Sequence, residues 1–251
     1  MRIVRDVGYI KRKKRLATLA ALGGVALLGS AFWLATGGNP NAVLIAYAPL
    51  LAGTLVFHFG MQQVAKWNRT PRNDEALDAV LKGLGERYGL VHYSTLGKHV
   101  VEHALVHPGG VLTLTVRDTP GSVQYRNGRW RKSGGGFSRL FGLGGPQLGN
   151  PNSDAAADVA AVDAALDAAQ QAVDVDGAIV FLSPRVELDV EEPDFPVTNA
   201  DGLLELIRTL PVDPSLTAND RKALVDLLAT GEQVEQQQPV SRRRPVKRRA
   251  A

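Results

Sequence analysis

The sequence contains no cysteine in 251 residues. Disulfide bonds and metal sites built on thiolates are therefore excluded, and the absence suits a reducing compartment without proving one. Aromatic residues are also few, at 6% of the chain, whereas the hydrophobic share of 45% is typical of a folded protein. The length is sufficient for one medium-sized domain and additional segments.

Two long stretches near the N-terminus lack charge. Residues 16–36 contain no ionisable side chain, and residues 42–65 are interrupted only by His58, Gln62 and Gln63. Each stretch is close to the roughly 20 apolar residues that cross a hydrocarbon core of about 30 Å. A secretory signal would have a shorter apolar core and no second span. We therefore interpret the two stretches as transmembrane helices joined by a tight turn.

Positive charge is distributed unevenly around these stretches. Seven lysines and arginines lie within residues 1–15, none lies in the turn, and Lys66, Arg69 and Arg72 follow the second stretch. Lysine and arginine accumulate on the cytoplasmic side of membrane proteins. We therefore expect an inner-membrane protein whose basic N-terminal segment and C-terminal domain are both cytoplasmic.

The rest of the chain alternates between the periodicities of helices and strands. Helices are expected at 73–88, 153–173, 201–210 and 218–229, and strands at 99–107, 111–117, 122–125 and 177–182. This order of helix, antiparallel strands, helix, strand and helices predicts an α/β fold. The expected divisions are a domain at 72–195 with a flexible glycine-rich loop at 133–150, C-terminal helices at 196–231, and a disordered basic tail at 232–251.

A row of polar residues lies on one face of the strand expected at 111–117. Alternation along a strand places Thr113, Thr115 and Arg117 on the face opposite the apolar residues. The row is a working site, the remnant of one, or a solvated face.

The domain carries a series of motifs whose spacing is specific. They are Asp74-Glu75 at the head of a helix, Tyr88, the segment VEHALVHPGGVLTLTVRDTPG (101–121), Trp130, Asn150-Pro151 and VDGAIVF (175–181). This series, over residues 74–185, resembles the nuclease-related domain, or NERD, of the PD-(D/E)xK restriction-endonuclease-like superfamily. The resemblance implies a restriction-endonuclease-like α/β domain behind the helical hairpin.

The resemblance also implies where a nuclease site would lie. In that superfamily an Asp and a Glu hold Mg²⁺ or Mn²⁺, and a Lys acts on the attacking water. The Asp position holds Glu102, the Glu position holds Thr115 and the Lys position holds Arg117, while Asp154 replaces a family Gln and Glu75 is kept. We therefore expect a degenerate, inactive site with no cofactor. If the site is active, Glu102 is the expected ligand of Mg²⁺ or Mn²⁺.

Charge divides the domain into two halves. Residues 82–139 carry nine basic against three acidic side chains, and residues 151–236 carry four basic against eighteen acidic ones. The basic half is a candidate surface for DNA or RNA. Its candidate residues are Arg117, Arg126, Arg129, Arg131, Lys132 and Arg139. Alternatively, the two halves attract each other within or between molecules.

Six further cations lie in the tail, between residues 242 and 249. They would attract anionic lipid head groups or nucleic acid equally well. Our leading hypothesis is a membrane-anchored, catalytically inactive module that binds nucleic acid or acts as a scaffold. Two alternatives remain. One is a metal-dependent nuclease with a rebuilt site, and the other is a structural membrane protein that binds an unknown protein through its acidic half.

Overall fold

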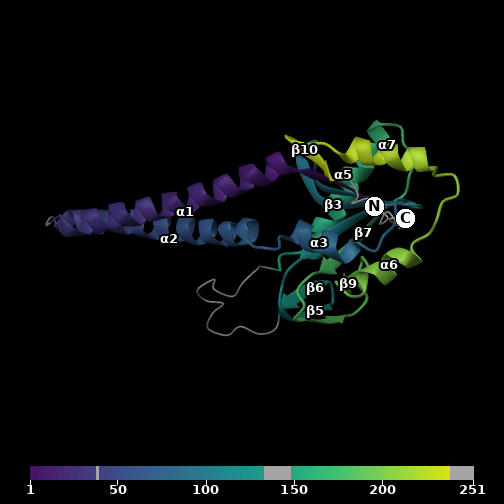
Figure 1. Ribbon diagram of the computed structural model, residues 1–251. Helices are drawn as coiled ribbons and strands as arrows, with labels where there is room; N and C mark the ends of the chain where they lie inside the picture. Colours follow the sequence, from purple (N-terminus) through teal and green to yellow (C-terminus); the bar gives the residue numbers. More distant parts are fainter. Residues whose placement is uncertain (38–39, 133–147, 238–251) are drawn as a thin grey trace, which may run out of the picture.

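The computed structural model describes residues 1–37, 40–132 and 148–237. The chain forms a long helical hairpin and an α/β domain, and the hairpin projects from one end of the domain (Figure 1). The hairpin consists of α1 (Val7–Thr36) and α2 (Pro40–Asn68). The expected order of apolar helices followed by an α/β domain is thus confirmed.

Glycines allow α1 and α2 to pack closely. A Cβ atom on Gly24 would lie 2.4 Å from the backbone nitrogen of Phe57, and one on Gly60 would lie 2.4 Å from that of Ala21. Both distances are far shorter than van der Waals contact, so a larger residue at either position would push the helices apart. Small residues have this role at many helix interfaces in membranes.

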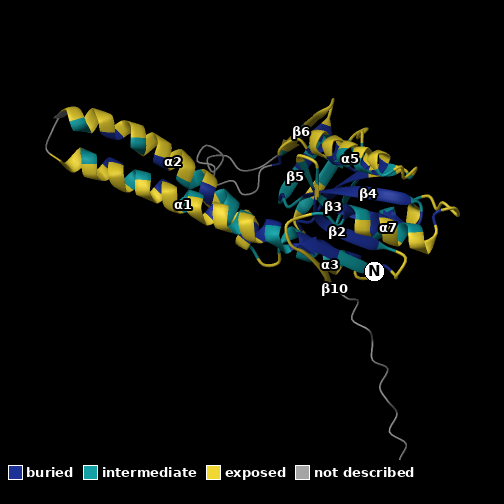
Figure 2. Cartoon of the chain, turned by 90° about the horizontal axis from the view of Figure 1, so that it is seen from above, coloured by how far each residue is buried: buried dark blue, intermediate teal, exposed yellow. Residues whose placement is uncertain are grey.

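Most apolar side chains of the hairpin face outward (Figure 2). Leu22, Leu44 and Leu55 are 60%, 71% and 72% exposed. A core helix of a soluble protein would bury such residues, and soluble monomers rarely expose a large apolar surface. Both helices are long and apolar enough to cross a membrane, which suggests membrane association.

The main sheet of the domain has seven strands in the order β10-β1-β2-β3-β4-β7-β9. The strands β2, β3 and β4 are antiparallel neighbours, whereas β7 runs parallel to β4, β9 parallel to β7, and β1 parallel to β2. The bounds are β1 Arg2–Asp6, β2 Gly89–Leu96, β3 His99–His107, β4 Gly110–Arg117, β7 Val175–Phe181, β9 Val197–Asn199 and β10 Val234–Gln237.

Helices cover both faces of this sheet. The helices α3 and α6 pack on one face around Leu105 and Leu114, whereas α5 and α7 pack on the other around Ala104 and Val162. Their bounds are α3 Asn73–Leu81, α5 Pro151–Ala168, α6 Leu203–Thr209 and α7 Ala218–Leu228. A mixed sheet with helices on both faces confirms the α/β class.

A second sheet of three strands, in the order β6-β5-β8, packs beside the first. Its inner face places Val123 and Trp130 against Ile179 and Phe181 of β7. The bounds are β5 Gly121–Arg126, β6 Arg129–Lys132 and β8 Val186–Val190.

The polar row on β4 is covered rather than solvated. Thr113 is fully buried and Thr115 is 3% exposed. Both hydroxyls have acceptors, because Thr113 donates to the carbonyl of Asp176 (3.2 Å) and Thr115 to the carboxylate of Asp158 on α5 (3.1 Å). The interpretation of this row as a solvated face is therefore wrong, because α5 packs over it.

Three helical predictions need shorter or shifted bounds. The helix expected at 73–88 ends at Leu81, since Gly83 and Gly85 interrupt it, and β2 follows at Gly89. The helix expected at 153–173 begins earlier, at a proline suited to a first helical turn, and ends at Ala168. The two C-terminal helices agree with the predictions to within two residues at each end.

Six strands were not predicted: β1, β2, β6, β8, β9 and β10. The tail expected to be disordered from residue 232 is wrong for Val234–Gln237, because β10 pairs there with β1. The remainder of that tail, 238–251, lies outside the described residues. So do residues 133–147 of the glycine-rich loop, including the candidate Arg139.

Candidate functional site at the base of the hairpin

The positions aligned with the nuclease site gather where β3 begins and β4 ends. In the antiparallel pairing of these strands Ala104 lies opposite Thr113. The pairing of the two strands ends there, so Glu102 and Thr115 lie two residues beyond the last pair, on the same face of the sheet as Ala104 and Thr113. Glu102 lies at the point where the hairpin joins the domain, because it contacts Lys66 of α2.

Glu102 is paired with a cation from the hairpin. The Nζ atom of Lys66, near the end of α2, lies 2.8 Å from Oε1 of Glu102. Burial raises the pKa of the Glu102 carboxyl, but the charge and hydrogen bond of Lys66 outweigh it and hold the pKa below its usual value. Glu102 is therefore ionised and already neutralised by the chain itself.

Arg117 is held by three groups of the domain. Its Nε donates to the carbonyl of Leu148 (2.9 Å), Nη1 donates to the carbonyl of Val116 (3.0 Å), and Nη2 forms an ion pair with Asp154. The side chain is only 16% exposed. A guanidinium remains protonated at any working pH, so Arg117 cannot act as a base. Its contacts join β4 to the first turn of α5.

Asp158 of α5 is a site residue that the sequence analysis missed. Its carboxylate accepts from Thr115 and lies 2.7 Å from Nε2 of His99. Burial raises the pKa of Asp158, against the opposing effect of these two hydrogen bonds. The sequence did contain a signal for this residue: Asp158 is an acid on the face of α5 that also buries Ala155 and Val162.

Two further carboxylates near the site also have cationic partners. Asp118, directly after β4, forms an ion pair with Arg69. Glu75 forms an ion pair with Arg72 (2.9 Å) and accepts from its backbone N–H (3.0 Å), which caps α3. Glu75 therefore has a structural role at the start of α3.

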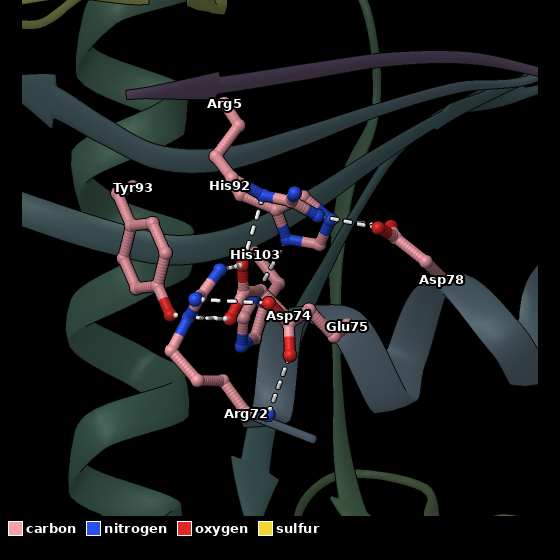
Figure 3. Close-up of polar contacts among 8 residues, drawn as sticks. All are labelled: Arg5, Arg72, Asp74, Glu75, Asp78, His92, Tyr93 and His103. Atoms are coloured by element: carbon pink, nitrogen blue, oxygen red, sulfur yellow. Dashed lines mark hydrogen bonds and ion pairs between the residues drawn. The ribbon is translucent and has the colours of Figure 1, made fainter. Parts of the chain in front are cut away.

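A buried ionic network adjoins the site (Figure 3). Its centre is Asp74, which is fully buried. Arg72 donates two hydrogen bonds to it, at 3.0 and 2.9 Å, Tyr93 donates one at 3.2 Å, and Nε of Arg5 lies 2.8 Å away. Burial raises the pKa of Asp74, but the hydrogen bonds from Arg72 and the charge of Arg5 hold it below its usual value. Arg5 also contacts Asp78.

Two histidines extend this network into the sheet. Nε2 of His92 lies 2.9 Å from Asp78, and its Nδ1 lies 2.7 Å from Nδ1 of His103. A carboxylate only accepts, so His92 donates through Nε2 and accepts from His103 through Nδ1. The remaining nitrogen of His103, Nε2, is then an acceptor without a hydrogen-bond partner among the described residues. Burial and the neighbouring His92 lower the pKa of His103 to about 3, so His103 is neutral.

The residues do not fit a divalent metal. Thr115 supplies no carboxylate, Glu102 is paired with Lys66, and Asp158 is engaged by Thr115 and His99. The described ranges contain no cluster of three His, Cys, Asp or Glu residues suited to a metal ion. Magnesium is normally held by carboxylates, together with waters and substrate oxygens.

Some candidate residues for nucleic-acid binding form ion pairs within the domain, and others are exposed. Arg126 forms ion pairs with Asp189 (3.0 Å) and Glu191 (3.2 Å) of the acidic half, as Arg117 does with Asp154. Arg129 and Arg131 are exposed on one face of β6, and Lys132 is half-buried on the other. The two charged halves therefore attract each other within one molecule at two points.

Comparison with protein-family models, with curated proteins and with solved structures finds no match to this chain.

Proposed function

We propose that the chain is a membrane-anchored scaffolding module built on a catalytically inactive, nuclease-related domain. The fold is compatible with the NERD resemblance, because α3, β3, β4, α5 and β7 follow in the order that the motifs imply. Glu102 and Thr115 lie on the same face of the neighbouring strands β3 and β4, which agrees with the same alignment. The restriction-endonuclease-like fold and the membership in that superfamily are part of this proposal.

One observation carries the proposed inactivity: Lys66 neutralises Glu102. An ammonium group 2.8 Å from the carboxylate occupies the surroundings that a metal ion would need. A metal would have to displace this internal cation and would gain no second carboxylate from Thr115. The balance therefore favours the ion pair over metal binding.

The membrane anchor follows from α1 and α2. Their outward-facing apolar side chains would be solvated at high cost unless lipid covers them. The surplus of lysine and arginine at the base of the hairpin supports the proposal that this base, the domain and both termini lie on the cytoplasmic side of the inner membrane.

Scaffolding is favoured over nucleic-acid binding by the ion pairs within the domain. Arg117 and Arg126 are engaged by acidic residues, which leaves Arg129 and Arg131 as exposed cations on β6. Two exposed arginines can release few counterions from a nucleic acid, so this surface of the domain alone would bind it weakly at physiological salt.

The test uses the full-length protein in lipid nanodiscs. We expect no Mn²⁺ binding in a titration followed by electron paramagnetic resonance, and no cleavage of labelled DNA or RNA with Mg²⁺ or Mn²⁺. Partners captured from lysate should persist after nuclease treatment. Their loss after that treatment would favour nucleic-acid binding, and metal binding by the wild type would contradict the proposed inactivity.

One observation favours a second candidate, a nuclease with a rebuilt site. Asp158 supplies a carboxylate directly beside Thr115, on the same side of the sheet as Glu102. In that case Mn²⁺-dependent cleavage would be present and would be lost in both Asp158→Asn and Glu102→Gln.

A further inference from the structure

We propose that Lys13, Lys14 and Arg15 at the base of α1 form a binding surface for the head groups of anionic phospholipids. The inference rests on the proposed insertion of α1 and α2 into a membrane. These three residues lie in a different part of the chain from the basic C-terminal tail, whose cations are residues 242–249.

The hairpin joins the domain through a rigid aromatic cluster. The rings of Tyr9, Trp67 and Tyr93 lie 5.4 to 5.7 Å apart, and all three residues are at most 7% exposed. Tyr93 adopts a left-handed backbone conformation with a φ of 61°, which is uncommon for an aromatic residue. The packed rings compensate for this strain. The helices therefore leave the domain in a fixed direction and not through a flexible linker.

This junction sets the depth of the basic residues. The charge-free stretch of α1 begins at Leu16, seven residues after Tyr9, which corresponds to about 10 Å of helix. The head-group layer on each side of the hydrocarbon is roughly 5–8 Å thick. Lys13, Lys14 and Arg15 lie within about 5 Å of Leu16 along the helix axis, and therefore at the level of the head groups.

The acidic residues around the base are occupied by other groups. Glu102, Asp118 and Glu232 are paired with Lys66, Arg69 and Arg12. A fourth acid, Asp6, accepts backbone hydrogen bonds from Tyr9 at the start of α1 and from Glu232 and Gln233, just before β10. Within the described ranges, these four acids are thus engaged by groups other than the basic residues next to Leu16.

The three proposed lipid ligands have no acidic partner among the described residues. The ammonium of Lys13 lies 5.2 Å from the centre of the Tyr9 ring, which is neutral. Lys14 and Arg15 form no ion pair within the described ranges of the chain. A fixed group of three uncompensated cations at head-group depth attracts the anionic lipids of the surrounding leaflet.

The tail is separated from this surface by the direction of β10. This strand is antiparallel to β1, with Val234 opposite Asp6 and Gln237 opposite Ile3. Since β1 leads into α1, β10 leads away from the hairpin. The cations of residues 242–249 therefore follow the end of β10 that lies farther from the membrane, and they can be tested as a separate source of lipid binding.

The experiment measures lipid selectivity with the full-length protein in vesicles of phosphatidylcholine. Spin-labelled phosphatidylglycerol and phosphatidylcholine are compared by electron paramagnetic resonance, which gives the relative association of each lipid with the protein. Each cation near the surface contributes about a factor of five to such an attraction. We expect wild-type protein to prefer the anionic lipid severalfold, and Lys14→Gln with Arg15→Gln to lose at least fivefold of that preference.

A matched control removes two cations elsewhere. Lys82 and Arg87 are exposed and lie at the opposite end of β2 and α3 from the hairpin. Replacing both by Gln should leave the lipid preference unchanged. A variant with all six tail cations of 242–249 replaced by Gln should also keep it.

Three results would overturn the proposal: no anionic preference in the wild type, equal loss in the Lys82 and Arg87 control, or complete loss in the tail variant. Resistance of each protein to alkaline extraction reports membrane insertion independently. Insertion without lipid selectivity would therefore refute this inference alone, whereas failure to insert would refute the proposed anchor.

Discussion

Arg5→Met should destabilise the domain strongly. The Arg5 side chain is 9% exposed and contacts both Asp74 and Asp78, so it joins β1 to α3. Methionine keeps much of the length of the side chain but removes the charge. Removing one partner of a buried ion pair typically costs about 3–5 kcal/mol, because the remaining charge stays buried.

The expected loss lies near the lower end of that range. Asp74 keeps its hydrogen bonds from Arg72 and Tyr93, and Asp78 keeps His92. We therefore expect about 3 kcal/mol, which corresponds to a decrease in Tm of roughly 6–12 °C for a domain of this size. Arg5→Lys should give a smaller decrease, because one ammonium group cannot replace the forked contacts of a guanidinium.

Thermal unfolding of the full-length protein in detergent, followed by near-ultraviolet circular dichroism, measures this effect. Arg126→Met is the matched control, since its ion pair with Asp189 is about half exposed on both sides. Such pairs contribute about 0–1 kcal/mol, so its Tm should change little. If Arg5→Met lowers the Tm no more than Arg126→Met does, the buried network does not stabilise the domain and the reasoning is wrong.

Three other predictions concern titration and helix packing. The pKa of His103 is lowered to about 3 in the fold, so the unfolded chain binds the extra proton between pH 6.5 and 3, and stability should fall as the pH falls through that range. His103→Gln should flatten this dependence, and equal slopes would contradict the assignment. Lys66→Met should lower the Tm by about 2–4 °C at pH 7, from a loss of about 1 kcal/mol. The pKa of Glu102 is lowered in the fold, so the effect should decrease as the pH falls through that lowered pKa, and an effect independent of pH would refute the ion pair. Gly60→Leu should separate α1 from α2 and lower the thermal stability, whereas Gly29→Leu, with open space around its Cβ position, should not.

The elements that the sequence predicted well are those stabilised by their own pattern. The strand β3 has the predicted bounds, His99–His107, because apolar residues dominate it and a Pro-Gly-Gly turn follows. The apolar helices α1 and α2 are equally evident, since absence of charge over a sufficient length needs no partner to be recognised. In these segments the structure that the local sequence favours is the same as the structure that the whole fold requires.

Strands stabilised by distant partners were not predictable in this way. The segment RIVRD of β1 is half polar, and the segment VEQQ of β10 has a single apolar residue. The strand β10 pairs with β1 across more than 200 residues, as Gln237 does with Ile3, and β1 also pairs with β2, more than 80 residues away. A window of sequence contains no trace of that pairing.

The candidate site contains one feature that the sequence pattern predicted and one that depends on a distant segment of the chain. Motif spacing alone predicted that Glu102 and Thr115 lie together, but the partner of Glu102, Lys66, comes from a membrane helix 36 residues earlier. The threonine at position 115 and the ion pair between Lys66 and Glu102 depend on each other. With a glutamate at position 115 the pair would carry two negative charges, one lysine would leave one of them uncompensated, and a divalent cation would be the stronger partner. With threonine there, the single charge of Lys66 is sufficient. The ion pair between Lys66 and Glu102 therefore joins the proposed inactivity to the rigid attachment of the domain to α2.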